Sequence, residues 1–227
     1  MKQFNRIVLN IPHSTNNMAG MAGWKKNNIF IEDIKKWTDW YTDIIFGTNE
    51  ENIIPIVFPY SRFYIDAERL IDDEMEKIGQ GIIYTEFNDN VRTISNEEKE
   101  KLMIIYNNHI SCIKKQLTEK SLLIDCHSFP SELSDNSICI GFNEDWSKPS
   151  EEIISNIVKI FEKMGYSVGI NTPYSNSLSP KCNFTYKSLM IEVNKRCYMD
   201  ERTLSLNPNF YNICGAISNV YNYILSL

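Results

Sequence analysis

Short apolar runs rich in β-branched residues alternate along the chain with longer segments of helical periodicity. The runs that predict strands lie at residues 6–11, 53–58, 122–126, 137–140, 167–170 and 188–193. The segments that predict helices lie at residues 31–46, 96–119, 150–164 and 209–227. Strands that alternate with helices of about ten residues or more predict an α/β sandwich with a parallel or mixed sheet.

Two of the predicted helices carry clear start signals. Ser95 is followed by Glu98 in the S-x-x-E pattern of a capping box, in which each side chain binds a free backbone N–H of the other residue. Ser150 precedes Glu151 and Glu152, and acidic residues suit the positive end of the helix dipole. Both helices are therefore expected to begin next to these serines.

Three predicted strands run into polar residues at their carboxyl ends, in the segments VLNIPHS, LLIDCHS and LMIEVNK. In open α/β sheets, ligands bind outside the carboxyl ends of the strands. His13 and His127, two of the three histidines of the chain, lie at such ends. This coincidence predicts a functional site there.

Composition narrows the class of protein. A chain of 227 residues, 43% of them hydrophobic, can bury a sizeable core and fits one domain over residues 1–227. A net charge of −6 with scattered Lys and Arg argues against nucleic acid as a partner. The N-terminus lacks a signal-peptide pattern, and no apolar run reaches the roughly 18 residues of a membrane span. We therefore expect a cytoplasmic protein without a membrane partner.

The six cysteines form no C-x-x-C pair, which argues against a cysteine zinc knuckle or a thioredoxin motif. Their neighbours are mostly apolar, as expected for reduced residues of the core. Cys126 differs from the others because it adjoins His127, a candidate ligand.

His13 and His127 are candidate metal ligands. A catalytic zinc ion takes about three protein ligands of His, Asp or Glu type and keeps one position for water. The two histidines are far apart in sequence, so local spacing alone leaves open that each is satisfied by backbone hydrogen bonds.

Further segments occur in order with these histidines: IPHS around His13, SR at 61–62 before DAER at 66–69, DCHS at 125–128, and IEVN at 191–194 before YMDE at 198–201. WTDWYTD at 37–43 and NTPYS at 171–175 accompany them. This ordered set, from about residue 8 to 202, resembles the N-formylglutamate amidohydrolase family, which is similar in architecture to zinc carboxypeptidases and aspartoacylases. The resemblance implies a three-layer sandwich of the phosphorylase/peptidyl-hydrolase type. Its mixed, mostly parallel sheet would be flanked by helices and carry one divalent metal, expected to be Zn²⁺.

The resemblance assigns His13 and His127 as the metal-binding histidines but leaves the third ligand open. Carboxypeptidases use a Glu three residues after the first His, where this chain has Asn16, a poor zinc ligand. The alternatives are Asp66, His109 and Glu192. Asp66 matches an Asp that orients the first histidine from behind, or it binds the metal directly. His109 also suits a hydrogen-bonded histidine at the edge of the core.

The resemblance also places substrate-binding groups. Arg69 matches an arginine that holds the substrate carboxylate, since a guanidinium binds carboxylate with two parallel hydrogen bonds. Arg62 is a second anchor or polarises the scissile carbonyl, with a surface salt bridge as the alternative. Glu68 stands beside this anchor, where many relatives have Asn. Ser128 and Tyr174 complete the substrate-binding candidates.

Glu192 is the candidate general base. It lies in a strand between apolar neighbours, where burying an unpaired carboxylate costs several kcal/mol. The resemblance implies that Glu192 takes a proton from the attacking water and passes it to the leaving amine, a contribution of about 10²–10⁴ in rate. A structural salt bridge is the alternative.

The resemblance implies a zinc-dependent amidohydrolase that acts on a small anionic substrate, N-formyl-L-glutamate, and releases formate and glutamate. Another N-acyl amino acid or a short peptide is the alternative substrate, because Glu68 and residues 175–180 depart from many relatives. Asn16 favours a third possibility, a catalytically silent binding protein. The polar loop at residues 171–183 has the length of a functional loop or lid.

Overall fold

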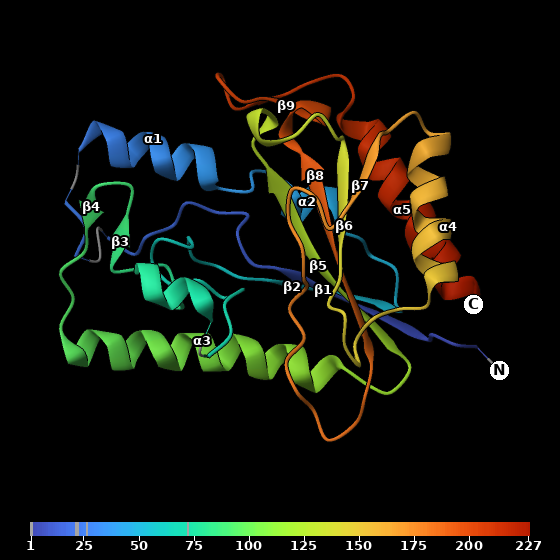
Figure 1. Cartoon of the computed structure of the whole chain (residues 1–227), viewed down its shortest axis with the longest axis horizontal. Coiled ribbons are helices and arrows are strands. Elements are labelled where there is room, and N and C mark those ends of the chain that lie inside the picture. Colours follow the sequence, from blue (N-terminus) through green and yellow to red (C-terminus); the bar gives the residue numbers. More distant parts are fainter. Residues whose placement is uncertain (1, 21–22, 26, 72) are drawn as a thin grey trace.

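The computed structural model describes residues 2–20, 23–25, 27–71 and 73–227. Within this described part, the main sheet has six strands in the order β2-β1-β5-β8-β6-β7 (Figure 1). They are β1 Arg6–Ile11, β2 Ile53–Val57, β5 Ser121–Phe129, β6 Ile138–Gly141, β7 Val168–Ile170 and β8 Lys187–Asn194. β2, β1, β5 and β8 are parallel, whereas β6 is antiparallel to β8 and parallel to β7. The sheet is therefore mixed and mostly parallel, as predicted.

Helices cover both faces of this sheet. The α-helices of the described residues are α1 Asn28–Trp37, α2 Thr42–Ile45, α3 Asn96–Gln116, α4 Glu151–Lys163 and α5 Phe210–Ser226. α4 packs on β6 and β7, α5 packs on β1 and α4, and the short α2 contacts β5 and α5. α3 lies on the opposite side, against β1 and β2 (Figure 1). The helix–sheet–helix arrangement confirms the predicted α/β sandwich.

Short elements lie in the connections. β3 Glu86–Phe87 pairs with β4 Asn90–Val91, and β9 Met199–Asp200 pairs with β10 Ser205–Leu206. The 3-10 helices are η1 Glu74–Ile78, η2 Ser131–Leu133 and η3 Lys195–Cys197. In Figure 1, α1, β3 and β4 lie beside the far half of α3, away from the sheet. An aromatic cluster supports this region, formed by Met18, Trp24, Phe30, Phe63, Tyr84 and Phe87.

The central strands present different chemistry on their two faces. Toward α4 and α5, they contribute only apolar side chains to the core: Ile7, Leu9, Ile11, Leu122, Ile124, Cys126, Leu189, Ile191 and Val193. Alternate residues point to the other face, where Val8 and Leu123 pack with Ile113 of α3. Toward the carboxyl ends, that second face becomes polar and buried, with Asn10, Asp125, His127 and Glu192. Because successive side chains of a strand point to opposite faces, the same strands supply the core on one face and the wall of a site on the other.

The predicted helix at 31–46 is divided, which corrects the sequence-based boundary. α1 ends at Trp37, Thr38 is extended, and Tyr41 has a positive φ of 66° before α2 begins. In the interruption, the backbone N–H of Asp39 donates to the His13 carbonyl at 2.9 Å. Lys195 Nζ donates to the Lys36 carbonyl at the end of α1. These tertiary hydrogen bonds replace the helical ones and turn Asp39 toward the sheet.

The predicted helix starts are confirmed, whereas only three of the six cysteines are buried. The Ser95–Glu98 capping box is present, and the Ser150 side chain accepts from Ile153 N at the start of α4. No cysteine is paired in the described part of the chain, but Cys112 is exposed rather than buried, because its side of α3 faces away from the sheet. No helix among the described residues has the length and apolarity needed to cross a membrane.

Candidate functional site

The carboxyl ends of three neighbouring strands bring the principal candidates together. β1, β5 and β8 are adjacent in the sheet. His13 follows β1, while His127 of β5 and Glu192 of β8 are paired Cα partners. The ring centroids of His13 and His127 are 5.1 Å apart. The fold thus brings the candidate residues of these three strand ends into one place.

A buried carboxylate holds His13 from behind. His13 Nε2 donates to Asp66 Oδ1 at 2.7 Å, and Tyr84 OH donates to Asp66 Oδ2 at 2.8 Å. Burial alone would raise the pKa of the Asp66 carboxyl, but the charges of His13, Arg69 and Arg62 hold it well below its usual range. An ionised Asp66 fixes the tautomer of His13 and leaves Nδ1 directed into the site. Asp66 thus occupies the orienting position rather than the interior of the site.

His127 also lies between buried carboxylates, one near each ring nitrogen. Asp125 Oδ1 lies 3.2 Å from His127 Nε2, and Asp39 Oδ2 lies 3.1 Å from Nδ1. Burial alone would lower the pKa of His127, but the nearby carboxylates of Glu68, Asp125 and Asp39 outweigh it and raise that pKa well above its ordinary value. The imidazole therefore sits in an environment that favours positive charge.

Asp39 connects the two histidines. Its Oδ2 lies 3.1 Å from His127 Nδ1 and 3.7 Å from His13 Nδ1. Asp39 is buried, and although burial opposes ionisation, hydrogen bonds from His127 and His13 hold its pKa well below the usual range. One ionised oxygen therefore lies between two imidazole nitrogens.

Glu68 supplies a further carboxylate from the opposite wall. Its Oε2 is 3.9 Å from His13 Nδ1, and its Oε1 is 3.8 Å from His127 Nε2. One possible ligand atom from each of these three residues falls within 4.8 Å of the others, so the group could hold a metal ion. The sequence-based reading placed Glu68 with the substrate; the geometry places it among the candidate metal ligands as well.

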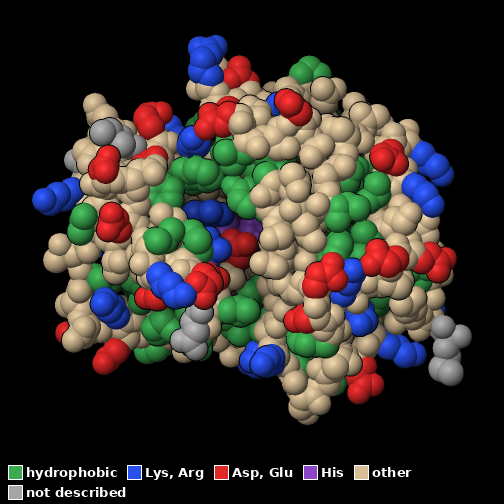
Figure 2. Space-filling view, viewed as in Figure 1, with side chains coloured by type: hydrophobic (Ala, Val, Ile, Leu, Met, Phe, Trp, Pro, Cys, Tyr) green, Lys and Arg blue, Asp and Glu red, His purple; other side chains and the backbone are tan. Residues whose placement is uncertain are grey.

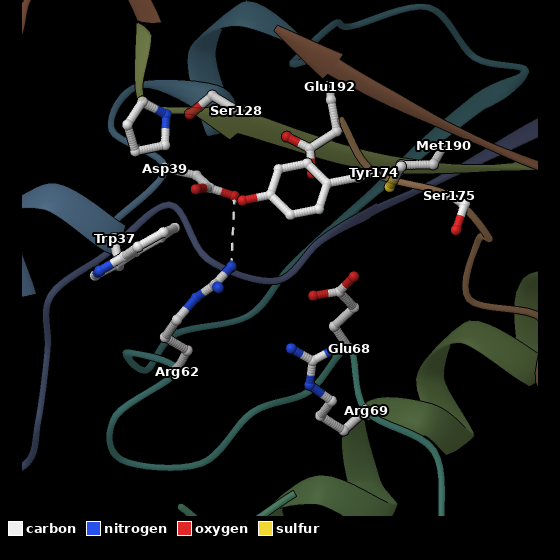
Figure 3. A pocket seen from close by; sticks show the side chains of 11 residues that line it. Trp37, Asp39, Arg62, Glu68, Arg69, Ser128, Tyr174, Ser175, Met190 and Glu192 are labelled. Atoms are coloured by element: carbon white, nitrogen blue, oxygen red, sulfur yellow. Dashed lines mark ion pairs between the residues drawn. The ribbon is translucent and has the colours of Figure 1, made fainter. Parts of the chain in front are cut away.

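Glu192 points into the same space from β8 (Figure 3). It is only 6% exposed, and its Oε2 has no hydrogen-bond partner among the described residues. Burial, the largest cause, raises the pKa of Glu192 to about 8. A buried carboxyl with an elevated pKa suits proton transfer near neutral pH.

These groups surround a cavity of about 110 Å³. In Figure 2 a hollow near the centre of the face exposes basic, acidic and histidine side chains at its floor. The lining residues are Trp37, Asp39, Arg62, Glu68, Arg69, Ser128, Pro130, Tyr174, Ser175, Met190 and Glu192. All six residues predicted as catalytic or substrate-binding are among them, and the two histidines and Asp66 lie beneath, fully buried.

The two arginines enter from the segment between β2 and α3 (Figure 3). Arg62 Nη2 lies 4.0 Å from Asp39 Oδ2 and contacts His13 Nδ1. Arg69 Nε lies 3.8 Å from Asp66 Oδ2. Among the described residues, the ion pairs of these arginines are with buried carboxylates of the site, Asp39 for Arg62 and Asp66 for Arg69, so Arg62 does not form the surface salt bridge that was its alternative there.

Ser128 and Tyr174 line the upper wall. Ser128 is the residue after His127 at the end of β5, and Tyr174 comes from the loop at 171–183, with its ring beside Glu192 in Figure 3. Burial is the main reason that the pKa of Tyr174 is raised, so its hydroxyl stays protonated and able to donate.

His109 and Asn16 lie outside the cavity lining. His109 Nε2 donates to Asn10 Oδ1 at 2.8 Å, and burial lowers its pKa to about 4. The reading of His109 as a hydrogen-bonded histidine of the core edge is confirmed. Asn16 is exposed, and carboxylates distant in sequence occupy the space near the histidines instead.

Asp39, Trp37 and Asp125 are residues of the site whose roles sequence reasoning missed. Trp37 and Asp39 belong to the WTDWYTD segment that carried the resemblance. Asp39 could have been recognised as an acidic residue among aromatic ones within a predicted helix. A carboxylate buried at such a position needs a charged or hydrogen-bonding partner. Asp125 lies two residues before His127 and therefore on the same face of β5.

Comparisons with known proteins agree with this geometry. The sequence matches the N-formylglutamate amidohydrolase family over residues 5–199. The fold is similar to that of an N-formylglutamate amidohydrolase from Ralstonia eutropha JMP134, with a TM-score of 0.80 and 17% identity, covering 98% of this chain and 94% of that one. It is also similar to a gene product from Agrobacterium tumefaciens, with a TM-score of 0.68 and 13% identity over 98% and 91% of the two chains.

No curated protein sequence matches this chain significantly. The structural likenesses, at such low identity, establish the fold. The family match extends over most of the chain and includes every candidate residue of the cavity. The chain therefore belongs to the N-formylglutamate amidohydrolase family.

Proposed function

We propose that this protein is a metal-dependent amidohydrolase that cleaves an N-acyl amino acid, with N-formyl-L-glutamate as the lead substrate and formate and L-glutamate as products. The observation that carries the proposal is one cavity that combines two buried histidines with facing carboxylates, a buried Glu192, and two arginines. This set supplies metal ligands, a proton carrier and anion-binding groups for one reaction.

The donor set fits a divalent metal, and zinc is the expected ion. Imidazole nitrogen and carboxylate oxygen are typical zinc ligands. His13 and His127 would each bind through a ring whose far nitrogen faces a carboxylate, Asp66 or Asp125. When bound, the cation polarises the amide carbonyl and lowers the pKa of a water molecule.

Asp39 is the stronger candidate for the third ligand, with Glu68 beside it. Ligand atoms around a tetrahedral zinc ion lie roughly 3.3–3.5 Å apart, given bond lengths of about 2.0–2.2 Å. Asp39 Oδ2 lies 3.1 and 3.7 Å from the Nδ1 atoms of the two histidines, which brackets this spacing. Glu68 Oε2 lies 3.9 Å from His13 Nδ1, but Glu68 Oε1 lies 3.8 Å from His127 Nε2, the ring nitrogen that faces Asp125, so Glu68 approaches the metal-facing nitrogen of only one histidine.

Glu192 moves the proton. Its carboxylate accepts a proton from the attacking water, and the carboxylic acid then donates it to the nitrogen of the leaving amine. The elevated pKa makes the second transfer favourable. The buried position excludes bulk water from competing for that proton.

Arg62 and Arg69 select an anionic substrate. Both guanidinium groups line the cavity, and the Nε atoms of both have no hydrogen-bond partner among the described residues. A bound carboxylate would satisfy such donors. Trp37 also lines this cavity. Its Nε1 is a third buried donor that has no hydrogen-bond partner among the described residues.

The decisive experiment is formate release from N-formyl-L-glutamate by the purified protein before chelation, after chelation and after zinc add-back. We expect chelation to abolish release and zinc to restore it. Release unaffected by thorough chelation would refute the metal dependence. Tight zinc binding with no turnover of any N-acyl amino acid would instead favour a silent binding protein.

A further inference from the structure

A second cavity continues outward from the candidate site. It has a volume of about 290 Å³, and Glu68, Arg69 and Ser175 line both cavities. The inner cavity of about 110 Å³ has room for about four water molecules at roughly 30 Å³ each. The inner cavity thus suits the acyl group and the scissile amide, and the outer one offers space for a substrate that continues past Arg69.

One side chain shapes the wall of this outer cavity. Asn143 Nδ2 donates to the Ser177 carbonyl at 2.9 Å and to Ser179 Oγ at 3.0 Å, and Asn143 Oδ1 accepts from Ser177 N at 3.3 Å. These bonds join the segment after β6 to the loop at 171–183. The outer wall is therefore held together by side-chain hydrogen bonds of the protein itself.

The same loop is anchored to the middle of β5 and to the start of β8. Leu178 N donates to Asp125 Oδ2 at 3.0 Å, and Ser188 Oγ donates to the Leu178 carbonyl at 2.8 Å. Asp125 also faces His127. These bonds attach the middle of the loop to the same strand that carries His127, so the loop forms a wall between the inner and outer cavities.

The charge of the outer cavity differs from that of an anion site. Its lining includes the carboxylates of Glu68, Asp73 and Asp145 against the single guanidinium of Arg69. Asp145 Oδ1 accepts from Ser147 N and Oγ, and Asp73 Oδ1 accepts from Met75 N, while the other oxygen of each makes no hydrogen bond within the described residues. Serine and asparagine groups complete the wall. This cavity disfavours a carboxylate and suits a neutral polar or cationic group.

We propose that the outer cavity is a substrate subsite for a second amino-acid residue, and that it selects a polar or basic residue over an acidic one. The inference rests on the proposed amide hydrolysis. The substrate class is an N-acyl dipeptide: water adds across the N-acyl amide, the acyl group leaves as a carboxylic acid, and the dipeptide leaves with a free amine. Arg69, at the junction, faces the carbonyl or carboxylate of the first residue.

The test compares formate release from N-formyl-Glu, N-formyl-Glu-Lys, N-formyl-Glu-Ser and N-formyl-Glu-Glu. We expect kcat/KM to decrease from the Lys to the Ser to the Glu dipeptide, with the Lys dipeptide better than N-formyl-Glu. Binding of the products Glu-Lys and Glu-Glu, measured by calorimetry, gives a readout that does not depend on turnover.

Asp145→Asn tests the subsite directly. The variant keeps the Oδ1 acceptor of the local turn and removes only the charge. It should lower the preference for Lys over Glu, in both turnover and binding, by roughly fivefold, the scale of one solvent-exposed charge pair. Glu144→Gln is the matched control, because Glu144 is exposed, adjacent and absent from the cavity lining; its preference should equal that of the wild type.

The outcomes separate the two proposals. In one outcome, N-formyl-Glu is turned over, but the dipeptides have no higher kcat/KM and do not differ from one another. This result overturns the subsite and leaves the proposed function intact. Absence of turnover, together with Lys-selective dipeptide binding that Asp145→Asn weakens, overturns the proposed function and supports the subsite. An Asp145→Asn preference equal to that of the wild type contradicts the assigned role of this charge.

Discussion

At the scale of single residues, the site is an arrangement of carboxylates around two imidazoles. Asp66 and Asp125 face the Nε2 atoms, whereas Asp39 lies between the Nδ1 atoms. In a low-dielectric setting, each buried charge is tolerated only because another compensates it. Such a set is therefore expected to respond strongly when one member loses its charge.

The first prediction distinguishes the candidate third ligands. Asp39→Asn should weaken zinc affinity by at least about 10–100-fold, the loss typical of a residue that only orients a ligand, because it replaces the carboxylate nearest to both Nδ1 atoms with a neutral amide. Glu68→Gln, with the same carboxylate-to-amide change, should weaken it by only a few-fold. Competition against a colorimetric chelator measures both affinities. A larger loss for Glu68→Gln would assign Glu68 as the ligand instead.

The second prediction concerns the proton carrier. Glu192→Gln should bind zinc with unchanged stoichiometry while kcat falls by about 10²–10⁴-fold, since an amide cannot accept the proton. Metal analysis and steady-state kinetics check the two parts. Glu132→Gln serves as the control, because Glu132 is exposed, and its kcat should remain that of the wild type. Full activity in Glu192→Gln would exclude the general-base role.

At the scale of elements, the break between α1 and α2 is what delivers Asp39 to the site. Lys195, 1% exposed, donates to the carbonyl of Lys36 where α1 ends. Burial, the largest cause, lowers the pKa of Lys195 to about 8, from an ordinary value near 10.4. The buried ammonium of Lys195 thus donates a hydrogen bond to a carbonyl at the end of α1. Burying this charge lowers the stability of the fold.

That cost gives the third prediction. Between about pH 8 and pH 10.5, the unfolded chain holds the Lys195 proton more tightly than the folded one does, so the free energy of unfolding rises with pH. Relative to Lys195→Met, the wild type should gain up to roughly 3 kcal/mol across this window. Urea unfolding at several pH values measures it. Lys159→Met, at an exposed position of α4, controls for loss of a lysine; parallel curves for wild type and Lys195→Met would contradict the assignment.

At the scale of the whole molecule, the site rests on an asymmetric sheet. On one face of the central strands, apolar side chains pack in a core with α4 and α5, while the other face carries the buried Asn10, Asp125, His127 and Glu192. The apolar face must supply the stability, because burying charged groups contributes little or opposes folding. The cavity lined by Arg62, Arg69 and Glu192 opens on the face of the molecule that Figure 2 shows.

The fourth prediction tests this division. Ile124→Ala, in the fully buried centre of β5, should lower the free energy of unfolding by about 2–5 kcal/mol through lost burial and a cavity. Ile104→Ala, the same substitution at a 60% exposed position of α3, should change it by no more than about 0.5 kcal/mol. Equal effects in denaturant unfolding would show that the core does not lie where the structure has it.

The sequence predicted the strands and most helices well, because their signals are local. The alternation in VLNIPHS and LLIDCHS identified buried strands with polar ends, and Ser95 with Glu98 marked the start of α3. The site residues of the ordered family segments were also found, and all six predicted catalytic and substrate-binding residues line one cavity. The long predicted helix at 31–46 failed because its interruption depends on His13 and Lys195, which no local pattern shows.

The sequence by itself therefore determined the α/β class, the positions of the main strands, and the kinds of side chain near the strand ends, although β5 runs to Phe129, beyond its predicted end at 126. Only the tertiary structure decided that Asp39 lies between two histidines, that Asp66 stands behind His13, and that Glu68 faces both rings. It also decided that an outer cavity continues from the inner one. The physical reason is the distance along the chain over which each effect acts. Hydrophobic periodicity and helix capping depend on residues a few positions apart. Asp39 and His127 are separated by 88 positions and meet only when the chain has folded around the sheet.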